Sequence, residues 1–195
     1  TAVPRERYAQ SNPEFFALRG GKRDASGNHL CISNPQVQER MLEEMETQLD
    51  KGYAWVELAQ TDGYQACQCA ACQALHPVEG ERLWIVHRRL AEEMLRRRPG
   101  GRIMIISYGP TALPPRTFER FPENVVVQLC SYSPRMMAAW APFQVDKTVY
   151  IYNWGSYKLP GLGPTRTPRF AIEQVRRFLD HRVRGIYLCG GYDPG

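Results

Sequence analysis

The sequence lacks the long apolar segments of membrane proteins. None of its apolar runs approaches the roughly 18 consecutive residues needed to cross a bilayer, which argues against a membrane-spanning helix. A charged start followed by an apolar stretch, the pattern of a secretory signal peptide, is also missing. Because the chain starts at Thr1 rather than at Met, we expect it to be a segment of a longer or processed precursor.

Internal repeats, low-complexity tracts and linker-like stretches are also missing, so the sequence predicts a single domain over residues 1–195. Hydrophobic residues make up 43% and charged residues 23% of the chain, which is ordinary for a globular protein. The 25 Lys and Arg outnumber the 20 Asp and Glu, for a formal charge of +5. These basic residues lie mostly in helix-patterned segments among acids, which favours solvated helix faces over a nucleic-acid groove. We therefore expect no nucleic-acid partner.

Short apolar runs alternate with amphipathic segments along the chain, which is typical of an α/β protein with a parallel sheet or barrel. Helical periodicity covers one segment from Pro35 to about Lys51, one over about 81–98 and one that begins at Pro168. About six strands do not close the usual eight-stranded barrel. The pattern therefore predicts either a (β/α) barrel that is incomplete in this chain or a parallel sheet that stays open. The predicted strands cover residues 15–18, 54–58, 103–107, 125–129, 149–152 and 186–189.

Polar and aromatic side chains follow the carboxyl ends of the predicted strands, where (β/α) barrels gather their functional groups. Aromatic rings at such a mouth suit the apolar face of a sugar ring, and amides or imidazoles can bond its hydroxyl groups. The candidates for carbohydrate binding are Asn28, His29, Tyr108, Tyr132, Asn153, Trp154 and Tyr157.

Two carboxylates near one predicted strand are candidates for catalysis. Asp62 follows the strand directly, and Gly63 lets the chain turn sharply so that the acid can project over the barrel mouth. The alternative is that Asp62 only bonds the backbone of its own turn. Glu57 lies inside the strand, where burial would raise its pKa and suit it to general acid work. A structural ion pair with an Arg is the alternative for Glu57.

The cysteines include a compact cluster, Cys67, Cys69 and Cys72, with metal-ligand spacing. Cys31 is the natural fourth member, because its loop should emerge beside theirs. A structural zinc site, two disulfides or buried free thiols each account for the four residues. In each case the predicted role is to hold a loop rather than to catalyse, so we expect no cofactor for catalysis.

Several motifs together resemble one known family. They are the segments 15–18 (Phe-Phe-Ala-Leu), 21–23 (Gly-Lys-Arg), 28–35 (Asn-His-Leu-Cys-Ile-Ser-Asn-Pro), 61–63 (Thr-Asp-Gly) and 67–72 (Cys-Gln-Cys-Ala-Ala-Cys). This set is similar to the domain of unknown function 4838 (DUF4838) family, a bacterial family that resembles glycoside hydrolases of the α-glucuronidase and hexosaminidase type. The likeness extends over nearly the whole chain.

The resemblance implies a TIM-type barrel that binds or cleaves carbohydrate. It also implies an exported protein, secreted or periplasmic, in which other domains of the same longer chain accompany the barrel. In the related hydrolases an acid after the fourth strand protonates the leaving oxygen, and the matching position here is Asp62. A glycosidase usually needs a second carboxylate, unless an N-acetyl group of the substrate assists. Asp193, after the last predicted strand, is the first candidate and Glu57 the second.

A non-catalytic carbohydrate-binding or structural barrel is the main alternative, with the same aromatic residues but no acid pair. A zinc-dependent hydrolase is a third hypothesis. It is disfavoured because catalytic zinc keeps an open position, commonly with His or carboxylate ligands.

Overall fold

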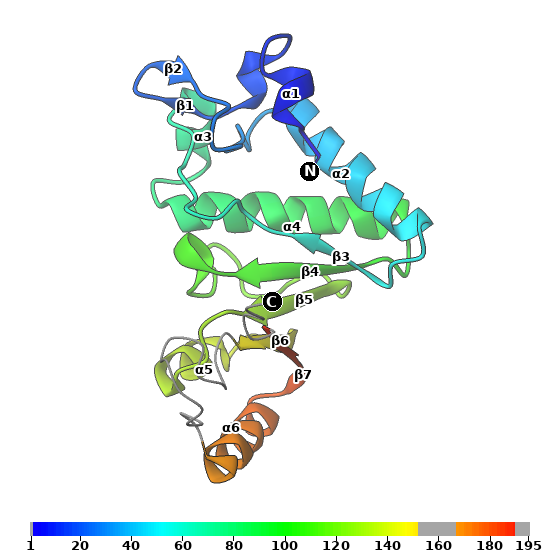
Figure 1. The fold of residues 1–195 in the computed structure, drawn as a ribbon, viewed down its shortest axis with the longest axis vertical. Helices are drawn as coiled ribbons and strands as arrows, with labels where there is room; N and C mark the ends of the chain where they lie inside the picture. The colour runs from blue at the N-terminus through cyan, green and yellow to red at the C-terminus, as the bar shows by residue number, and fades with distance from the viewer. Residues whose placement is uncertain (1, 152–166, 190–195) are drawn as a thin grey trace, which may run out of the picture.

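The computed structural model describes residues 2–151 and 167–189. Figure 1 shows their arrangement. The helices are α1 (Arg5–Tyr8), α2 (Pro35–Asp50), α3 (Ala70–Leu75), α4 (Glu79–Arg97), α5 (Pro134–Trp140) and α6 (Pro168–Asp180), with short 3-10 turns η1 (Pro13–Phe15) and η2 (Gly109–Thr111). The strands are β1 (Leu18–Arg19), β2 (Lys22–Arg23), β3 (Trp55–Leu58), β4 (Arg102–Ser107), β5 (Val125–Leu129), β6 (Asp146–Ile151) and β7 (Val183–Leu188).

The main sheet has five parallel strands in the order β3-β4-β5-β6-β7, so each strand lies beside the one that follows it in the chain. The register runs from Val56 to Ile103 and on to Val125. This confirms the predicted α/β class with a parallel sheet. Within the described residues the sheet stays open, with β3 and β7 as its two edges.

The first predicted strand, 15–18, is wrong as a member of this sheet. Phe15 ends the turn η1, Phe16 forms an isolated antiparallel bridge with Leu30, and Leu18 begins the small hairpin of β1 and β2. A four-residue apolar run does not by itself reveal its partner. Two glycines with positive φ, Gly20 at 52° and Gly21 at 79°, form the hairpin turn that folds this segment back on itself.

The helix predicted from Pro35 is confirmed as α2, and its start has a local cause. The side chain of Asn34 accepts hydrogen bonds from the backbone N–H groups of Gln36 (2.8 Å) and Val37 (3.4 Å), and Pro35 occupies the first turn. The helix ends before Gly52, whose φ is 89°.

The core lies on one face of the sheet. Alternate residues of β3 and β4, such as Val56 and Ile103, are buried against α4, α5 and α6 in one apolar cluster. Trp84 of α4 and Trp140 of α5 meet edge to face with ring centroids 5.7 Å apart, so these helices share that side of the sheet. Consistent right-handed crossovers between neighbouring parallel strands produce such an arrangement.

The connection from β4 to β5 contains no α-helix, and a buried carboxylate of α4 organises it instead. Glu81 accepts hydrogen bonds from the backbone N–H groups of Arg116 and Thr117 and from the Thr117 hydroxyl, at 2.9 to 3.2 Å. These bonds satisfy the buried acid and hold the loop against the helix.

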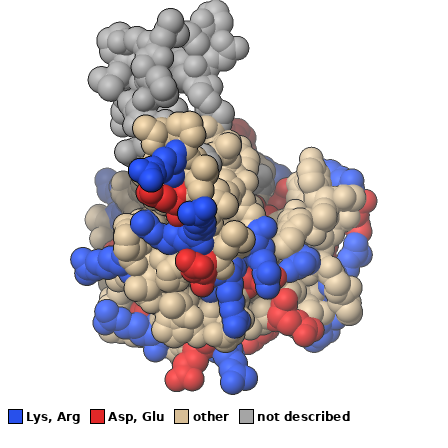
Figure 2. Space-filling view, turned by 90° about the horizontal axis from the view of Figure 1, so that it is seen from below, with Lys and Arg blue, Asp and Glu red and all other residues tan. Residues whose placement is uncertain are grey.

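Charged side chains of both signs are interspersed on the face shown in Figure 2. Arg97 of α4 pairs with Glu39 of α2 at 2.7 Å and with Glu93 of its own helix at 2.7 Å. Asp146 lies 3.6 Å from both Arg102 and Arg184. The interleaving inferred from the sequence is therefore present, and the absence of a nucleic-acid partner stays a prediction. No helix in the described part of the chain combines the length and apolarity needed to cross a bilayer.

Gly80 sets the distance between α4 and the turn after β4. A Cβ atom at this position would lie 2.1 Å from the carbonyl oxygen of Pro110. In an unobstructed helix, Gly→Ala stabilises by up to about 1 kcal/mol. We expect Gly80→Ala to have the opposite sign and to lower the free energy of unfolding by roughly 1–3 kcal/mol, because helix and turn must separate.

Urea denaturation would measure this change, with Glu79→Ala as the matched control at an exposed neighbouring position. The control should stay within about 0.5 kcal/mol of the parent protein. A more stable Gly80→Ala variant would contradict this account of the contact.

Candidate functional site

The loops that follow β3 and β4 meet at one edge of the sheet, because parallel strands all end on the same side. The side-chain amide of Gln60 donates to the carbonyl oxygen of Tyr108 and, at 3.0 Å, to the hydroxyl of Thr111. The Thr111 hydroxyl in turn donates to the Ile106 carbonyl at 3.1 Å. The two loops are therefore tied to each other and to the end of β4.

Asp62 is exposed in the loop after β3, and its carboxylate makes no hydrogen bond or ion pair with the residues that the structure describes. The alternative role of bonding its own turn is thus not observed. Its neighbour Thr61 donates to the Asn28 carbonyl at 3.2 Å, which brings the 24–34 loop beside the same turn. Gly63 has a φ of 62°, as expected for a sharp turn after the acid.

Glu57 lies on the second face of the sheet, the face opposite the apolar cluster. It forms no ion pair within the described residues, so the structural alternative for this acid is not observed. Partial removal from water raises the pKa of the Glu57 carboxyl above its ordinary value. The same side chain lines a cavity of about 500 Å³ along β3 together with Asn28, Trp55 and Gln60.

The remaining predicted binding residues differ in their accessibility. Tyr108 is 40% exposed, whereas His29 is only 4% exposed. The His29 ring faces the edge of Tyr64 with centroids 6.3 Å apart, and burial lowers the pKa of His29 and raises that of Tyr64. Tyr132 is partly buried and packs edge to face on Phe178 at 5.5 Å. Four further candidates lie outside the described residues: Asn153, Trp154, Tyr157 and Asp193.

The second face also carries polar residues that the sequence interpretation overlooked. Gln128 of β5 and Thr148 of β6 are register neighbours there. Tyr150 and Tyr187 stack beyond them, with ring centroids 4.8 Å apart. A hydrogen bond with Cys189 raises the pKa of Tyr150 to about 12. Alternation along β6 was the available signal, since every second side chain of a strand shares a face.

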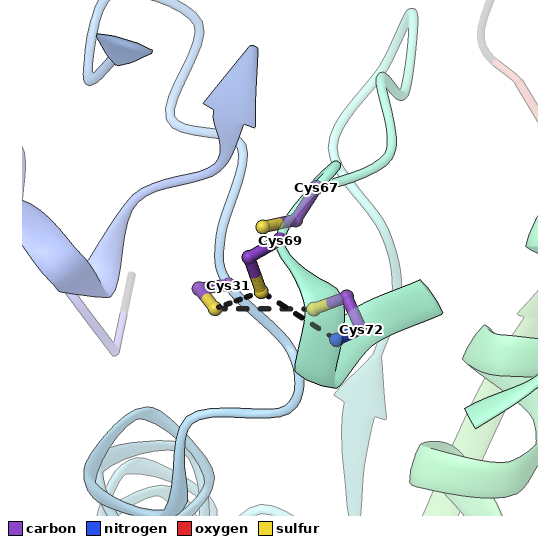
Figure 3. A group of neighbouring side chains, drawn as sticks. All are labelled: Cys31, Cys67, Cys69 and Cys72. Carbon is purple, nitrogen blue, oxygen red and sulfur yellow. Dashed lines mark hydrogen bonds between the residues drawn. The ribbon is translucent and has the colours of Figure 1, made fainter. Parts of the chain in front are cut away.

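Cys31, Cys67, Cys69 and Cys72 form a cluster, shown in Figure 3, in which all four sulfur atoms lie within 4.8 Å of one another. The prediction that Cys31 is the fourth member is confirmed. Its sulfur lies 3.7 Å from that of Cys69 and 3.8 Å from that of Cys72. Hydrogen bonding with Cys67 and Cys72 lowers the pKa of Cys31.

The cluster joins three segments of the chain. Cys31 lies in the 24–34 loop, and the other three cysteines lie between β3 and the first turn of α3. The hairpin adds backbone contacts, because the N–H of Leu18 donates to the Cys67 sulfur at 3.3 Å and the N–H of Gln68 donates to the Leu18 carbonyl at 2.8 Å. The loop that holds Asp62 therefore ends at a fixed anchor.

The family model for the domain of unknown function DUF4838 matches residues 1–156. The chain belongs to this family. No curated protein matches this DUF4838 chain. Among the solved structures that match is an O-GlcNAc hydrolase of Thermobaculum terrenum, as an Asp-to-Asn mutant, with a TM-score of 0.56 and 14% sequence identity. The match covers 83% of this chain but only 37% of that one, and at this identity it shows a shared fold.

The raised pKa of Glu57 can be tested by titration. We expect the Glu57 carboxyl to remain protonated at a pH where an ordinary glutamate, with a pKa of about 4.3, is already ionised. Because its folded pKa is the higher one, the stabilisation from this group is complete below the unfolded pKa. It is lost as the pH rises through the folded pKa.

Carboxyl carbon NMR over a pH series would measure this midpoint, with Glu57→Gln to identify the signal and to remove the corresponding pH dependence of stability. A midpoint at or below the ordinary value would show that the second face does not desolvate this acid.

Proposed function

We propose that the chain is part of a TIM-type (β/α) barrel in a longer glycoside hydrolase-like enzyme that cleaves a glycosidic bond. The sequential order of the parallel strands, with the described helices on one face of the sheet, supports the barrel. The last helix and strand, α6 and β7, expose apolar side chains: Leu179 is 66% exposed and Leu188 is 54% exposed. A following βα unit would cover them. Family membership and the fold shared with a glycoside hydrolase support the activity.

In this proposal Asp62 is the general acid that protonates the leaving oxygen. The observation that carries the assignment is an exposed carboxylate, unpaired among the described residues, at the carboxyl end of a parallel sheet. It lies in a loop that Thr61 ties to the Asn28 backbone. Gln60, next to Thr61, ties the same part of the loop to the Tyr108 backbone. Catalytic groups of (β/α) barrels lie at this end, because the loops there converge over the barrel mouth.

We choose the second carboxylate and the sugar contacts from residues near the same carboxyl end of the sheet. Glu57 lies on the face that would line the barrel interior. The second role needs an ionised carboxylate, and the raised pKa of Glu57 makes that carboxylate a stronger general base once it is ionised. Asp193 remains the other candidate for this role. We assign sugar contacts to Asn28 and Tyr108 at the rim, with His29, Tyr132, Asn153, Trp154 and Tyr157 as further candidates.

The structural neighbour suggests which substrate to try first. It is described as an O-GlcNAc hydrolase, so a chromogenic N-acetylglucosaminide is the first choice, followed by a panel of other glycosides. With an N-acetyl substrate, the acetamido group can take the place of the second carboxylate. The role of Asp62 would then remain while that of Glu57 became dispensable.

Asp62→Asn tests the proposal in the intact protein. We expect kcat on a substrate that the parent cleaves to fall by roughly 10²–10⁴-fold, because the amide cannot donate the proton. The loss should be smaller on a substrate whose leaving group needs no protonation. Asp50→Asn, at an exposed acid that ends α2, is the matched control and should retain full activity.

Unchanged turnover by Asp62→Asn on a substrate whose leaving group does need protonation would sink the assignment of the general acid. A parent protein that binds the sugars but cleaves none of them would instead favour the carbohydrate-binding alternative over an enzyme.

A further inference from the structure

The four sulfur atoms of the cysteine cluster surround a common centre. For a tetrahedral zinc ion with Zn–S bonds near 2.3 Å, the sulfur atoms stand roughly 3.8 Å apart. The distances from the Cys31 sulfur to those of Cys69 and Cys72 are 3.7 and 3.8 Å. All other pairs lie within 4.8 Å, so a small inward adjustment brings the four into one coordination shell.

The backbone around the cluster supports thiolate ligands. The N–H of Cys72 donates to the Cys69 sulfur at 3.5 Å within the Cys-x-x-Cys turn, where Cys69 is the N-cap of α3. The N–H of Leu18 donates to the Cys67 sulfur at 3.3 Å. Such bonds stabilise negative charge on sulfur.

Arg23 and Ser33 complete the surroundings. One guanidinium nitrogen of Arg23 lies 3.7 Å from the Cys67 sulfur while it also bonds the Phe16 carbonyl at 2.8 Å. Four thiolates and one Zn²⁺ carry a net charge of −2, which the guanidinium partly offsets. The Ser33 hydroxyl lies 3.0 Å from the Cys72 sulfur, 3.7 Å from that of Cys31 and 3.9 Å from that of Cys69, within reach of three ligand atoms.

The distances favour one shared ion over two disulfides. A disulfide brings two sulfur atoms to about 2.05 Å and so requires defined pairs. Cys31 is instead almost equally far from Cys69 and Cys72, which is the geometry of a common centre. Cys130 and Cys189 belong to other strand ends and do not join the group.

We propose that Cys31, Cys67, Cys69 and Cys72 bind one Zn²⁺ ion in a closed tetrahedral site. Four protein thiolates leave no open position, so the role of the ion is structural. It fastens the hairpin β1–β2 and the 24–34 loop to the loop that follows β3. Asp62 and Asn28 both lie in segments that this site holds, and the proposal is independent of the enzymatic function.

Metal analysis of the purified protein tests the site directly. We expect about one zinc per chain after dialysis against metal-free buffer, and all six cysteines as reduced thiols when the protein is denatured in chelator without reductant. Replacement of zinc by Co²⁺ should give the visible and charge-transfer absorption of tetrahedral cobalt thiolate. Cys69→Ser should lose most of the bound metal, whereas Cys189→Ser, outside the cluster, should retain it.

Chelation separates a structural ion from an incidental one. Removal of zinc should lower the melting temperature of the parent and of Cys189→Ser, because binding energy at a structural site is folding energy. If Cys69→Ser fails to fold, the metal content, thiol count and cobalt spectrum of the parent still decide the question. Absence of metal together with cysteines oxidised in pairs, or with six free thiols, overturns the proposal.

Discussion

The sequential, side-by-side order of the parallel strands is the constraint on which the rest of this structure depends. Each strand from β3 to β7 pairs with the next one in the chain, and the described helices between them pack on one face. The apolar cluster around Trp84 and Trp140 fills that side. As a result, the other face is left to side chains such as Glu57 and Gln128, and every strand ends at the same edge.

The loops at that edge owe their positions to a few polar contacts rather than to an extended apolar core. Glu81 holds the connection between β4 and β5 through backbone N–H groups, and Gln60 ties the loop after β3 to the one after β4. Buried polar groups need such partners, so each contact both satisfies a group and fixes a loop. In our proposal, this support is what leaves Asp62 exposed and free to act on a substrate.

The cysteine cluster plays the corresponding part on the other side of Asp62. Its members come from segments far apart in the chain, and the hairpin around Leu18 and Arg23 contacts it through N–H···S bonds. A bound ion would join these segments more firmly than thiol contacts alone, because the metal binding free energy is gained only when all four ligands converge. Asp62 and the cysteine cluster that anchors its loop therefore have separate roles in the proposal, the first catalytic and the second structural.

Much of the fold could be predicted from local sequence patterns. The apolar run at 125–129 and the Asn34-Pro35 cap predicted elements that the structure contains, because apolar runs and helix caps are properties of short segments. The same logic failed for residues 15–18. There the apolar run is short, and its partners, Leu30 and the residues after Gly21, became clear only in three dimensions.

The features of the candidate site also fall into two groups: those that local sequence predicts and those that depend on tertiary packing. The sequence by itself determined the α/β class, the grouping of the cysteine motif with Cys31 and the position of Asp62 after a strand, since each rests on local pattern and chain order. Only the tertiary structure decided that Glu57 lies on the second face, that His29 is buried and that Gln128 and Tyr150 share the face of Glu57. The physical reason is that burial, pKa and proximity depend on which distant segments pack together, and this is set by the whole core rather than by any one segment.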